Sequence, residues 1–364
     1  MSKIVLLGSY GRGNVGDDVF LVALTKLLGR HTVTANSAHN DLLPTEVINK
    51  ISTISTISNK DIIDKLKVFL KADYIIYGGG DLWVELYGSR FPRIALWKMA
   101  VVNTVAKVSR KKVIYVGCGC GNIRGFSLLL AKYSALLANL IIFRDEISRQ
   151  KIRKDAKTQV LPDLSITLSS KDIKLVNNVV KTLGIIPMYY IPDPVANYPK
   201  YLAQMISSCQ YALKQNISVK LIPMLKDPAI YDDVKVCDDI FKSVKALDIG
   251  ADISILKEVD SSNINDILQT IDVCLSTRLH GSILAAWLHV PVIGVSYRPK
   301  VSRFLKSVGL EISSIDIHDT DSLNDKMDLC FKNPNMFTID PTYLKTLRTE
   351  ARKEYIKTFK THVI

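Results

Sequence analysis

The sequence predicts an α/β protein made of two doubly wound domains that face each other across a cleft, with a C-terminal helix that packs back. Three observations predict this fold. The chain has 364 residues, which is more than one ordinary hydrophobic core can organise. Short apolar runs alternate with longer helical patterns in both halves, and glycines or charged residues follow most of the apolar runs.

The first half contains five predicted strands, each a short apolar run rich in Val, Ile or Tyr. They are residues 3–8, 31–36, 72–80, 112–119 and 140–145. Helical patterns separate them at 17–29, 60–71, 91–109 and 125–138. Strands that alternate with helices in this way form a parallel sheet covered on both faces.

The second half repeats the scheme after a polar linker at 169–174. Its predicted strands are 184–190, 218–224, 252–257, 272–277 and 291–297. Its predicted helices are 196–214, 229–247, 263–270, 279–288 and 300–308. A last helix is predicted at 342–360, because Leu344, Leu347, Ala351, Tyr355 and Phe359 form an apolar stripe between basic faces.

The net charge of +13 favours anionic partners such as phosphorylated small molecules or anionic lipid headgroups. Nucleic acid is the least favoured partner, because the lysines are spread along the chain without a zinc-finger, RNP or heptad pattern. The alternative is a basic but otherwise ordinary soluble surface.

The cysteines and the N-terminus indicate the compartment. Six cysteines lie mostly in apolar runs, which is typical of reduced core thiols in a cytoplasmic protein. Cys118 and Cys120 form a C-x-C pair without a second Cys/His pair at zinc spacing, so no metal site is expected. The apolar run at 4–7 is too short for a signal peptide, and Lys98 and Lys132 interrupt the longest apolar stretches.

Two glycine-rich turns follow strands of the first half. The turn after the first strand reads Gly8-Ser9-Tyr10-Gly11-Arg12-Gly13-Asn14-Val15-Gly16-Asp17-Asp18, and the helix after it would direct free amides at an anion. No Walker lysine follows, and the G-x-G-x-x-G match at 11–16 lacks the acidic partner of a dinucleotide site. Gly78-Gly79-Gly80-Asp81-Leu82-Trp83 follows the third strand. Both turns are candidate ligand contacts, and the alternative is tight βα turns without a ligand.

Charged side chains follow three further strands. Arg144 comes after the fifth strand, and Arg278-Leu279-His280 comes after the run 271–275. Lys300 follows the next strand in Tyr297-Arg298-Pro299-Lys300. Ligands of parallel sheets bind beyond the carboxyl ends of the strands, so these side chains are candidates for binding an anion. A structural ion pair for Arg144 and a core position for His280 are the alternatives.

The ordered set of these motifs resembles the polysaccharide pyruvyl transferase family. The matching segments are "GSYGRGNVGDD", "GGGDLW" at 78–83, "FRDEIS" at 143–148, "TRLHGSILAAW" at 277–287 and "SYRPK" at 296–300. The resemblance implies two Rossmann-like domains of the GT-B type. It also implies transfer of pyruvate from phosphoenolpyruvate to a sugar of a glycan or lipid-linked glycan, as a ketal, in exopolysaccharide or cell-wall biosynthesis.

By the same resemblance, the catalytic candidates are Arg144, Arg278, His280 and Lys300. The candidates for substrate binding are Tyr10, Gly11, Asn14, Asp17, Gly79, Gly80, Asp81 and Trp83. Residues 1–170 would form the acceptor-side domain with Arg144, residues 175–335 the donor-side domain, and residues 336–364 the C-terminal helix. The loop departs from the usual family pattern at residues 9–14, where Arg12 adds basic character.

The residue types suit this chemistry. Two guanidiniums can bind a carboxylate and a phosphate bidentately, and Lys300 can stabilise the departing phosphate. A histidine can act as the acid on the enol carbon or as the base on the sugar hydroxyl, and both roles stay open. No cofactor or metal is needed beyond phosphoenolpyruvate as the donor.

Two other functions share the predicted fold. A GT-B glycosyltransferase would use a nucleotide sugar, with Glu258 or Asp260 as candidates for its ribose. A catalytically silent glycan-binding protein is the second. We expect a cytoplasmic protein that reaches lipid-linked acceptors at the inner membrane face, with peripheral membrane contact.

Overall fold

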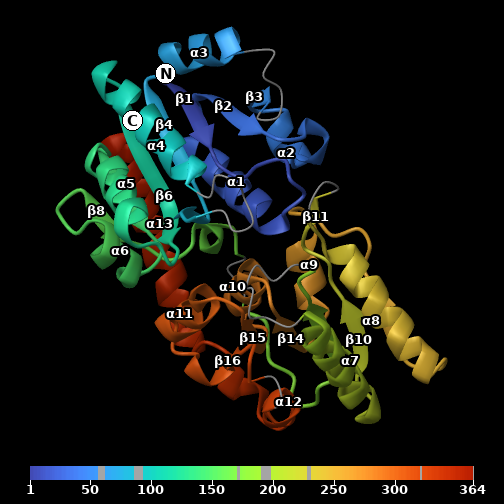
Figure 1. The fold of residues 1–364 in the computed structure, drawn as a ribbon. Coiled ribbons are helices and arrows are strands. Elements are labelled where there is room, and N and C mark those ends of the chain that lie inside the picture. Colours follow the sequence, from blue (N-terminus) through green and yellow to red (C-terminus); the bar gives the residue numbers. More distant parts are fainter. Residues whose placement is uncertain are drawn as a thin grey trace. The chain divides into compact units, whose positions relative to one another are not determined.

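The computed structural model describes residues 1–55, 62–85, 93–169, 173–189, 198–227, 231–319 and 322–363 (Figure 1). They belong to two compact units. The first unit comprises Met1–Arg12, Asp17–Leu168 and Thr349–Ile364, and the second comprises Gly13–Gly16 and Ser169–Arg348.

Several predicted segments lie partly outside the described residues. They are the linker at 170–172, the strand end at 190 and the helix starts at 60–61, 91–92, 196–197 and 229–230.

The first unit is built on an eight-stranded parallel sheet. Its order is β3-β2-β1-β4-β6-β7-β8, and β5 pairs with β6. The strands are β1 (Lys3–Leu7), β2 (Thr32–Ser37), β3 (Ser52–Ser55), β4 (Tyr74–Gly78), β5 (Asp81–Trp83), β6 (Lys112–Cys120), β7 (Leu140–Phe143) and β8 (Thr158–Val160). The sequence order reverses between β1 and β4, so this unit has a topological switch point there.

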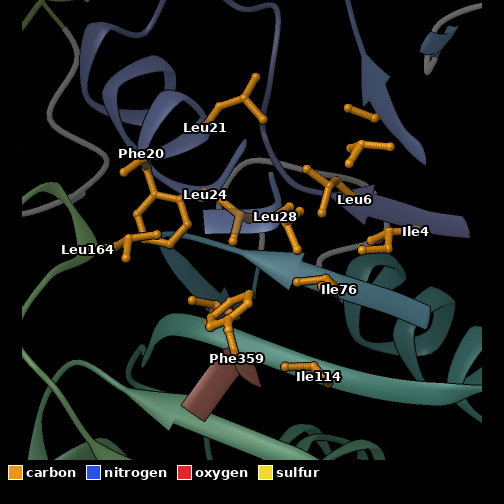
Figure 2. Packing of buried hydrophobic residues seen from close by; sticks show 14 of the residues in the cluster. Ile4, Leu6, Phe20, Leu21, Leu24, Leu28, Ile76, Ile114, Leu164 and Phe359 are labelled. Carbon is orange, nitrogen blue, oxygen red and sulfur yellow. The ribbon is translucent and has the colours of Figure 1, made fainter. Parts of the chain in front are cut away.

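Alternate side chains of this sheet enter two separate cores. On one face, Leu6, Ile76 and Ile114 pack against Leu24 of α1 (Val15–Leu28) and Phe359 of α13 (Pro341–His362) (Figure 2). Helix α13 is also tied to this unit through the Tyr355 hydroxyl, which donates to the carbonyl oxygen of Pro162 at 2.8 Å.

On the other face of the first sheet, Ile75, Tyr115 and Phe143 pack against helices. These are α3 (Ile62–Lys71), α4 (Ile94–Val108), α5 (Gly125–Leu136) and α6 (Glu146–Ile152). The short helices α2 (Thr45–Ile48), η1 (Asn40–Leu42) and η2 (Leu164–Leu168) complete the described part of this unit.

The second unit has a six-stranded parallel sheet in the order β13-β10-β9-β14-β15-β16. The strands are β9 (Thr182–Ile186), β10 (Ser218–Leu221), β13 (Ile253–Ile255), β14 (Val273–Ser276), β15 (Val292–Ser296) and β16 (Ser314–Asp316). Read along the chain this is the 3-2-1-4-5-6 order of a doubly wound sheet, with its switch point between β9 and β14. A small antiparallel hairpin joins β11 (Lys226–Asp227) and β12 (Tyr231–Asp232).

The helices of the second unit connect these strands. They are α7 (Tyr198–Lys214), α8 (Asp233–Leu247), α9 (Ile264–Gln269), α10 (Leu279–Trp287), α11 (Pro299–Ser307) and α12 (Leu323–Lys332). The turns η3 (Glu311–Ser313) and η5 (Pro334–Phe337) follow α11 and α12.

The predicted fold class is confirmed: there are two parallel α/β sheets and a long C-terminal helix. The sequence did not predict the strands β3, β5, β8, β11, β12 and β16 or the helices α2, α6 and α12. The six cysteines are all buried free thiols, as predicted from the apolar runs that contain them.

Candidate active site

The turn between β14 and α10 holds Arg278 and His280. Ser276 ends the strand, and its hydroxyl donates to the carbonyl oxygen of Arg278 at 2.8 Å. Arg278 is the N-cap residue of α10, and His280 lies in the first turn of that helix. A Cβ at Gly281 would lie 2.4 Å from Oγ of Ser276, so glycine is required for the serine to close this turn.

A buried carboxylate fixes the Arg278 side chain. Nε of Arg278 donates to Oδ2 of Asp233 at 3.0 Å, and Nη2 donates to Oδ1 at 2.5 Å. Asp233 is fully buried and also accepts bonds from the amides of Tyr189 and Met224. Burial opposes the charge on Arg278, but Asp233 more than offsets it, so the pKa of the guanidinium is raised. Two of its five N–H donors bind Asp233.

The His280 ring lies directly over Gly16. A Cβ at Gly16 would come within 2.2 Å of Nδ1 of His280, so only glycine leaves room for the ring in this position. The segment around Gly16 is anchored to the second unit by backbone bonds. The Val15 amide donates to the Met224 carbonyl at 3.0 Å, and the Lys226 amide donates to the Gly13 carbonyl at 3.0 Å.

The next turn, between β15 and α11, repeats the same design. Ser296 ends the strand, and its hydroxyl donates to the carbonyl oxygen of Arg298 at 2.9 Å. Arg298 is the N-cap residue of α11, and Lys300 follows in its first turn. Nζ of Lys300 lies 5.1 Å from the ring centroid of Tyr297. The two turns share the pattern Ser-x-Arg-x-(His or Lys), and β14 and β15 are neighbours in the sheet.

Arg278 therefore follows a strand at the switch point of the second sheet. Tyr201 links the segments that follow β9 and β14. Its hydroxyl accepts the Met188 amide at 3.0 Å and lies 3.0 Å from Oγ1 of Thr277. The first turns of α10 and α11 add partly unbonded backbone amides beside these side chains. The arrangement can bind a small, multiply charged anion.

In the first unit, Arg144 is held by an acidic partner of its own. Its guanidinium forms an ion pair with Asp81, and both side chains are mostly buried. Burial opposes the charge, but Asp81, Asp163 and Asp145 outweigh it and raise the pKa of Arg144. A Cβ at Gly119 would lie 2.7 Å from Oδ1 of Asp81, so that glycine makes room for the pair.

Three glycines after β1 and β4 make room for side chains of the same unit. Tyr10 is buried, and its hydroxyl donates to the Gly78 carbonyl at 3.3 Å. A Cβ at Gly78 would lie 2.3 Å from the Tyr10 hydroxyl, and one at Gly79 would lie 3.2 Å from the Phe20 ring. Gly11 has φ +66° and would meet Ser37 at 2.1 Å. Packing is thus sufficient to explain these three glycines.

The remaining predicted contacts have different surroundings. Trp83 is fully buried beside Tyr115 and Phe143, so the structure gives it a packing role. Asn14 accepts the Gly16 amide at 3.1 Å, and Asp17 lies in the first turn of α1. Gly80 has φ +80°, and among the described residues beyond its chain neighbours no heavy atom lies within 4 Å of the position its Cβ would take. Substrate contact by the residues of these turns stays a prediction.

Comparison with protein families decides the relationship. The polysaccharide pyruvyl transferase profile matches residues 14–299, which include the motifs around Arg144, Arg278 and His280. The chain belongs to the polysaccharide pyruvyl transferase family. Among curated proteins no relative is found for this pyruvyl transferase family member.

Solved structures share the fold of this family member at low identity. A putative UDP-N-acetylglucosamine 2-epimerase from Listeria monocytogenes has a TM-score of 0.60 at 11% identity, covering 100% of this chain and 97% of the other. Anabaena HepE, in complex with UDP and glucose, has a TM-score of 0.57 at 11% identity, covering 100% and 98%. The UDP-GlcNAc 2-epimerase from Neisseria meningitidis has a TM-score of 0.59 at 10% identity, covering 98% and 100%. These likenesses confirm the GT-B-like fold.

Sequence reasoning missed several residues of this pyruvyl transferase family member. Asp233 and Ser276 position Arg278, and Ser296 closes the second turn. The charge of Asp163 helps to raise the pKa of Arg144. The repeat of Ser-x-Arg-x-(His or Lys) at 276–280 and 296–300 was a signal that could have identified both serines. Within the described ranges, no group of three or more His, Cys, Asp or Glu side chains could hold a metal ion. No helix in those ranges is both long and apolar enough to cross a bilayer.

Proposed function

We propose that this protein transfers pyruvate from phosphoenolpyruvate to two hydroxyls of one sugar in a glycan or lipid-linked glycan, forming a pyruvate ketal. The observation that carries the proposal is the Arg278–Asp233 pair beside His280 at the switch point of the second sheet. Family membership supplies the reaction class.

The donor is a small enol that carries a carboxylate and a phosphate. Arg278 is held in one orientation by Asp233, so a bidentate bond to one of these anions costs little further side-chain entropy. Lys300 and the first turn of α11 lie at the end of the neighbouring strand and can take the other anionic group. We assign phosphoenolpyruvate to the ends of β14 and β15.

His280 is proposed to act on the enol. As the acid it gives a proton to the methylene carbon, which becomes the methyl group and leaves an electron-poor C2. One sugar hydroxyl attacks C2 and releases its proton. Phosphate then departs with the electron pair of its C–O bond, a second hydroxyl of the same sugar closes the ketal, and its proton leaves. The products are the ketal and inorganic phosphate.

Arg144 is proposed as a further donor-binding group, on the strength of its family motif. Its ion pair with Asp81 keeps it charged within the first unit. The residues proposed for acceptor binding are those of the two glycine-rich turns: Tyr10, Gly11, Asn14, Asp17, Gly79, Gly80 and Asp81.

The test uses the purified protein, phosphoenolpyruvate and sugars with paired hydroxyls. Phosphate release and a pyruvylated product by mass spectrometry are expected. His280→Gln should lower kcat by about 10²–10⁴-fold, the range of a general acid or base. His318→Gln, an exposed histidine of the same unit, serves as the control and should keep full activity. Full turnover in His280→Gln would remove this residue from the mechanism.

A second arm separates the proposal from nucleotide-sugar chemistry. Several structural neighbours are described in complex with UDP or UDP-sugars. We expect phosphoenolpyruvate to raise the melting temperature and UDP to leave it unchanged. Stabilisation by UDP alone would favour a glycosyltransferase or an epimerase instead.

A further inference from the structure

Two neighbouring helices of the first unit present apolar side chains to solvent. Helices α4 and α5 pack side by side over one face of the sheet (Figure 1). Their outward side chains form what we term the α4–α5 apolar face: Trp97, Val101, Val105, Val108, Phe126, Leu129, Tyr133 and Leu136. Each has more than a third of its surface exposed, with 57% for Val101 and 63% for Leu129.

This face is not explained by the folding of the unit. Both helices already bury an inner stripe, which includes Leu96 and Met99 on α4 and Leu130 and Ala131 on α5. A surface helix normally has charged or polar residues opposite such a stripe. Here the outer stripes are apolar as well, and the Trp97 and Phe126 rings join them with centroids 5.7 Å apart. A contiguous exposed apolar surface of this kind marks an interaction site.

The charge around the face identifies the partner. Residues 86–144 contain no Asp or Glu and ten Lys or Arg. Lys98, Lys107, Arg124 and Lys132 are exposed on or beside the two helices. Aromatic and aliphatic side chains bordered by lysines are typical of surfaces that lie in the headgroup region of an anionic bilayer. A two-fold contact between copies would bring these like charges together, so it is disfavoured.

The C-terminal helix does not offer an equivalent surface. Most of its apolar stripe is already covered: Leu344, Ala351, Tyr355 and Phe359 are at most 3% exposed, and Leu347 is partly buried. The basic side chains of α13 therefore lack an accompanying apolar stripe that could enter a membrane.

We propose that the α4–α5 apolar face docks this protein on an anionic lipid surface. Lysines can place their ammonium groups at the phosphates while the apolar side chains between them enter the acyl boundary. The inference goes beyond the proposed reaction and does not depend on it, because it rests on the first unit's surface alone.

Tryptophan fluorescence tests this directly. Trp97 is 47% exposed, whereas Trp83 and Trp287 are at most 1% exposed. With the full-length protein, vesicles of phosphatidylcholine and phosphatidylglycerol that contain brominated acyl chains should quench the emission of Trp97. Pure phosphatidylcholine vesicles and high salt should weaken the quenching. Trp97→Phe should still sediment with anionic vesicles but lose the quenching.

A matched pair of double variants locates the binding surface. Val101→Ser with Leu129→Ser removes two apolar groups from the face without changing charge, and should weaken vesicle binding about tenfold. Leu175→Ser with Val179→Ser makes the same change on exposed residues of the second unit and should bind as the unmodified protein does. Far-UV circular dichroism and melting temperature confirm that both variants fold.

Three outcomes would overturn the proposal. They are absence of binding to anionic vesicles, binding without quenching of Trp97, and a stable dimer that the Val101/Leu129 double variant dissociates. Vesicle binding without any pyruvyl transfer would leave the docking surface established and count only against the proposed reaction.

Discussion

Two arginines at strand ends are each held by a carboxylate of their own unit. Arg278 is bound to Asp233, which is fully buried, and Arg144 is bound to Asp81. A buried guanidinium needs a partner, because its desolvation otherwise costs several kcal/mol. The pairing also removes rotational freedom from the arginine before a ligand arrives. We therefore propose that each aspartate is a positioning residue for the arginine of its own unit.

A substitution can test whether the Asp233 carboxylate positions Arg278. Asp233→Asn keeps the shape of the side chain but removes the charge, so Arg278 loses its fixed orientation. We expect kcat/KM for phosphoenolpyruvate to fall about 10–100-fold, mainly through KM, which corresponds to about 1.4–2.7 kcal/mol. Steady-state kinetics with a melting curve measure both effects.

Asp232→Asn is the control for this change. Asp232 caps α8 through the Val234 amide at 2.8 Å, and asparagine caps a helix equally well. Activity should stay within about twofold of the unmodified protein. An equal loss in both variants, or a loss only in melting temperature, would contradict a positioning role for Asp233.

At the scale of elements, the alternation of apolar runs and helical patterns was sufficient to predict the two parallel sheets. The short edge strands β3 (STIS), β8 (TQV) and β16 (SID) were missed, because three or four mostly polar residues lack a readable period. Asp233 could not be predicted either, since an aspartate at a helix start is typical of a surface cap. Its burial depends on Arg278, 45 residues away.

The glycines of the first unit show a second limit of sequence reasoning. The glycines at 78–80 predicted a backbone that approaches a ligand or the facing domain. In the structure Gly78 and Gly79 accommodate Tyr10 and Phe20. The sequence indicates that some group lies close to the backbone at these glycines, but it does not identify that group. Of the three glycines at 78–80, Gly80 alone has open space among the described residues at the position of a Cβ, and its φ is positive.

Gly78→Ala tests this packing. The new Cβ would lie 2.3 Å from the Tyr10 hydroxyl and 3.0 Å from Leu24, so we expect a loss of about 1–3 kcal/mol in unfolding free energy. In a Tyr10→Phe background the closest clash is gone, so the loss should shrink by about 1 kcal/mol. Chemical denaturation of the four proteins of this cycle gives the coupling. The same loss in both backgrounds would show that Tyr10 is not the obstacle.

At the scale of the whole molecule, each unit has its own parallel sheet and core, but neither is one continuous segment. Residues 13–16 belong with the second unit, although the residues on both sides belong with the first. Residues 349–362 of α13 return to the first unit, where Tyr355 and Phe359 complete a core. This arrangement explains why Gly16 can support His280 although it lies 264 positions earlier in the sequence.

The cysteines report on the two cores separately. Cys118 and Cys120 lie in the first unit, and Cys209, Cys237, Cys274 and Cys330 lie in the second. Burial raises the pKa of Cys209 and Cys274 to about 12. At pH 8 only about one in ten thousand such thiols is ionised, against about a quarter of unfolded thiols with pKa near 8.5. The raised pKa favours the protonated thiol in the folded state. The contribution of these two thiols to the free energy of unfolding is therefore full below about pH 8.5 and falls as the pH rises above that value.

We therefore expect no rapid alkylation of the native protein at pH 8 and six modified thiols after full unfolding. With increasing denaturant, pulses of alkylating reagent followed by mass spectrometry should show the thiols appearing as one group of two and one group of four. Each group opens with the core that contains it, because its shielding depends on that core alone. Appearance of all six at one denaturant concentration would show instead that the units unfold together. Rapid native reaction at Cys209 or Cys274 would contradict the burial that raises their pKa.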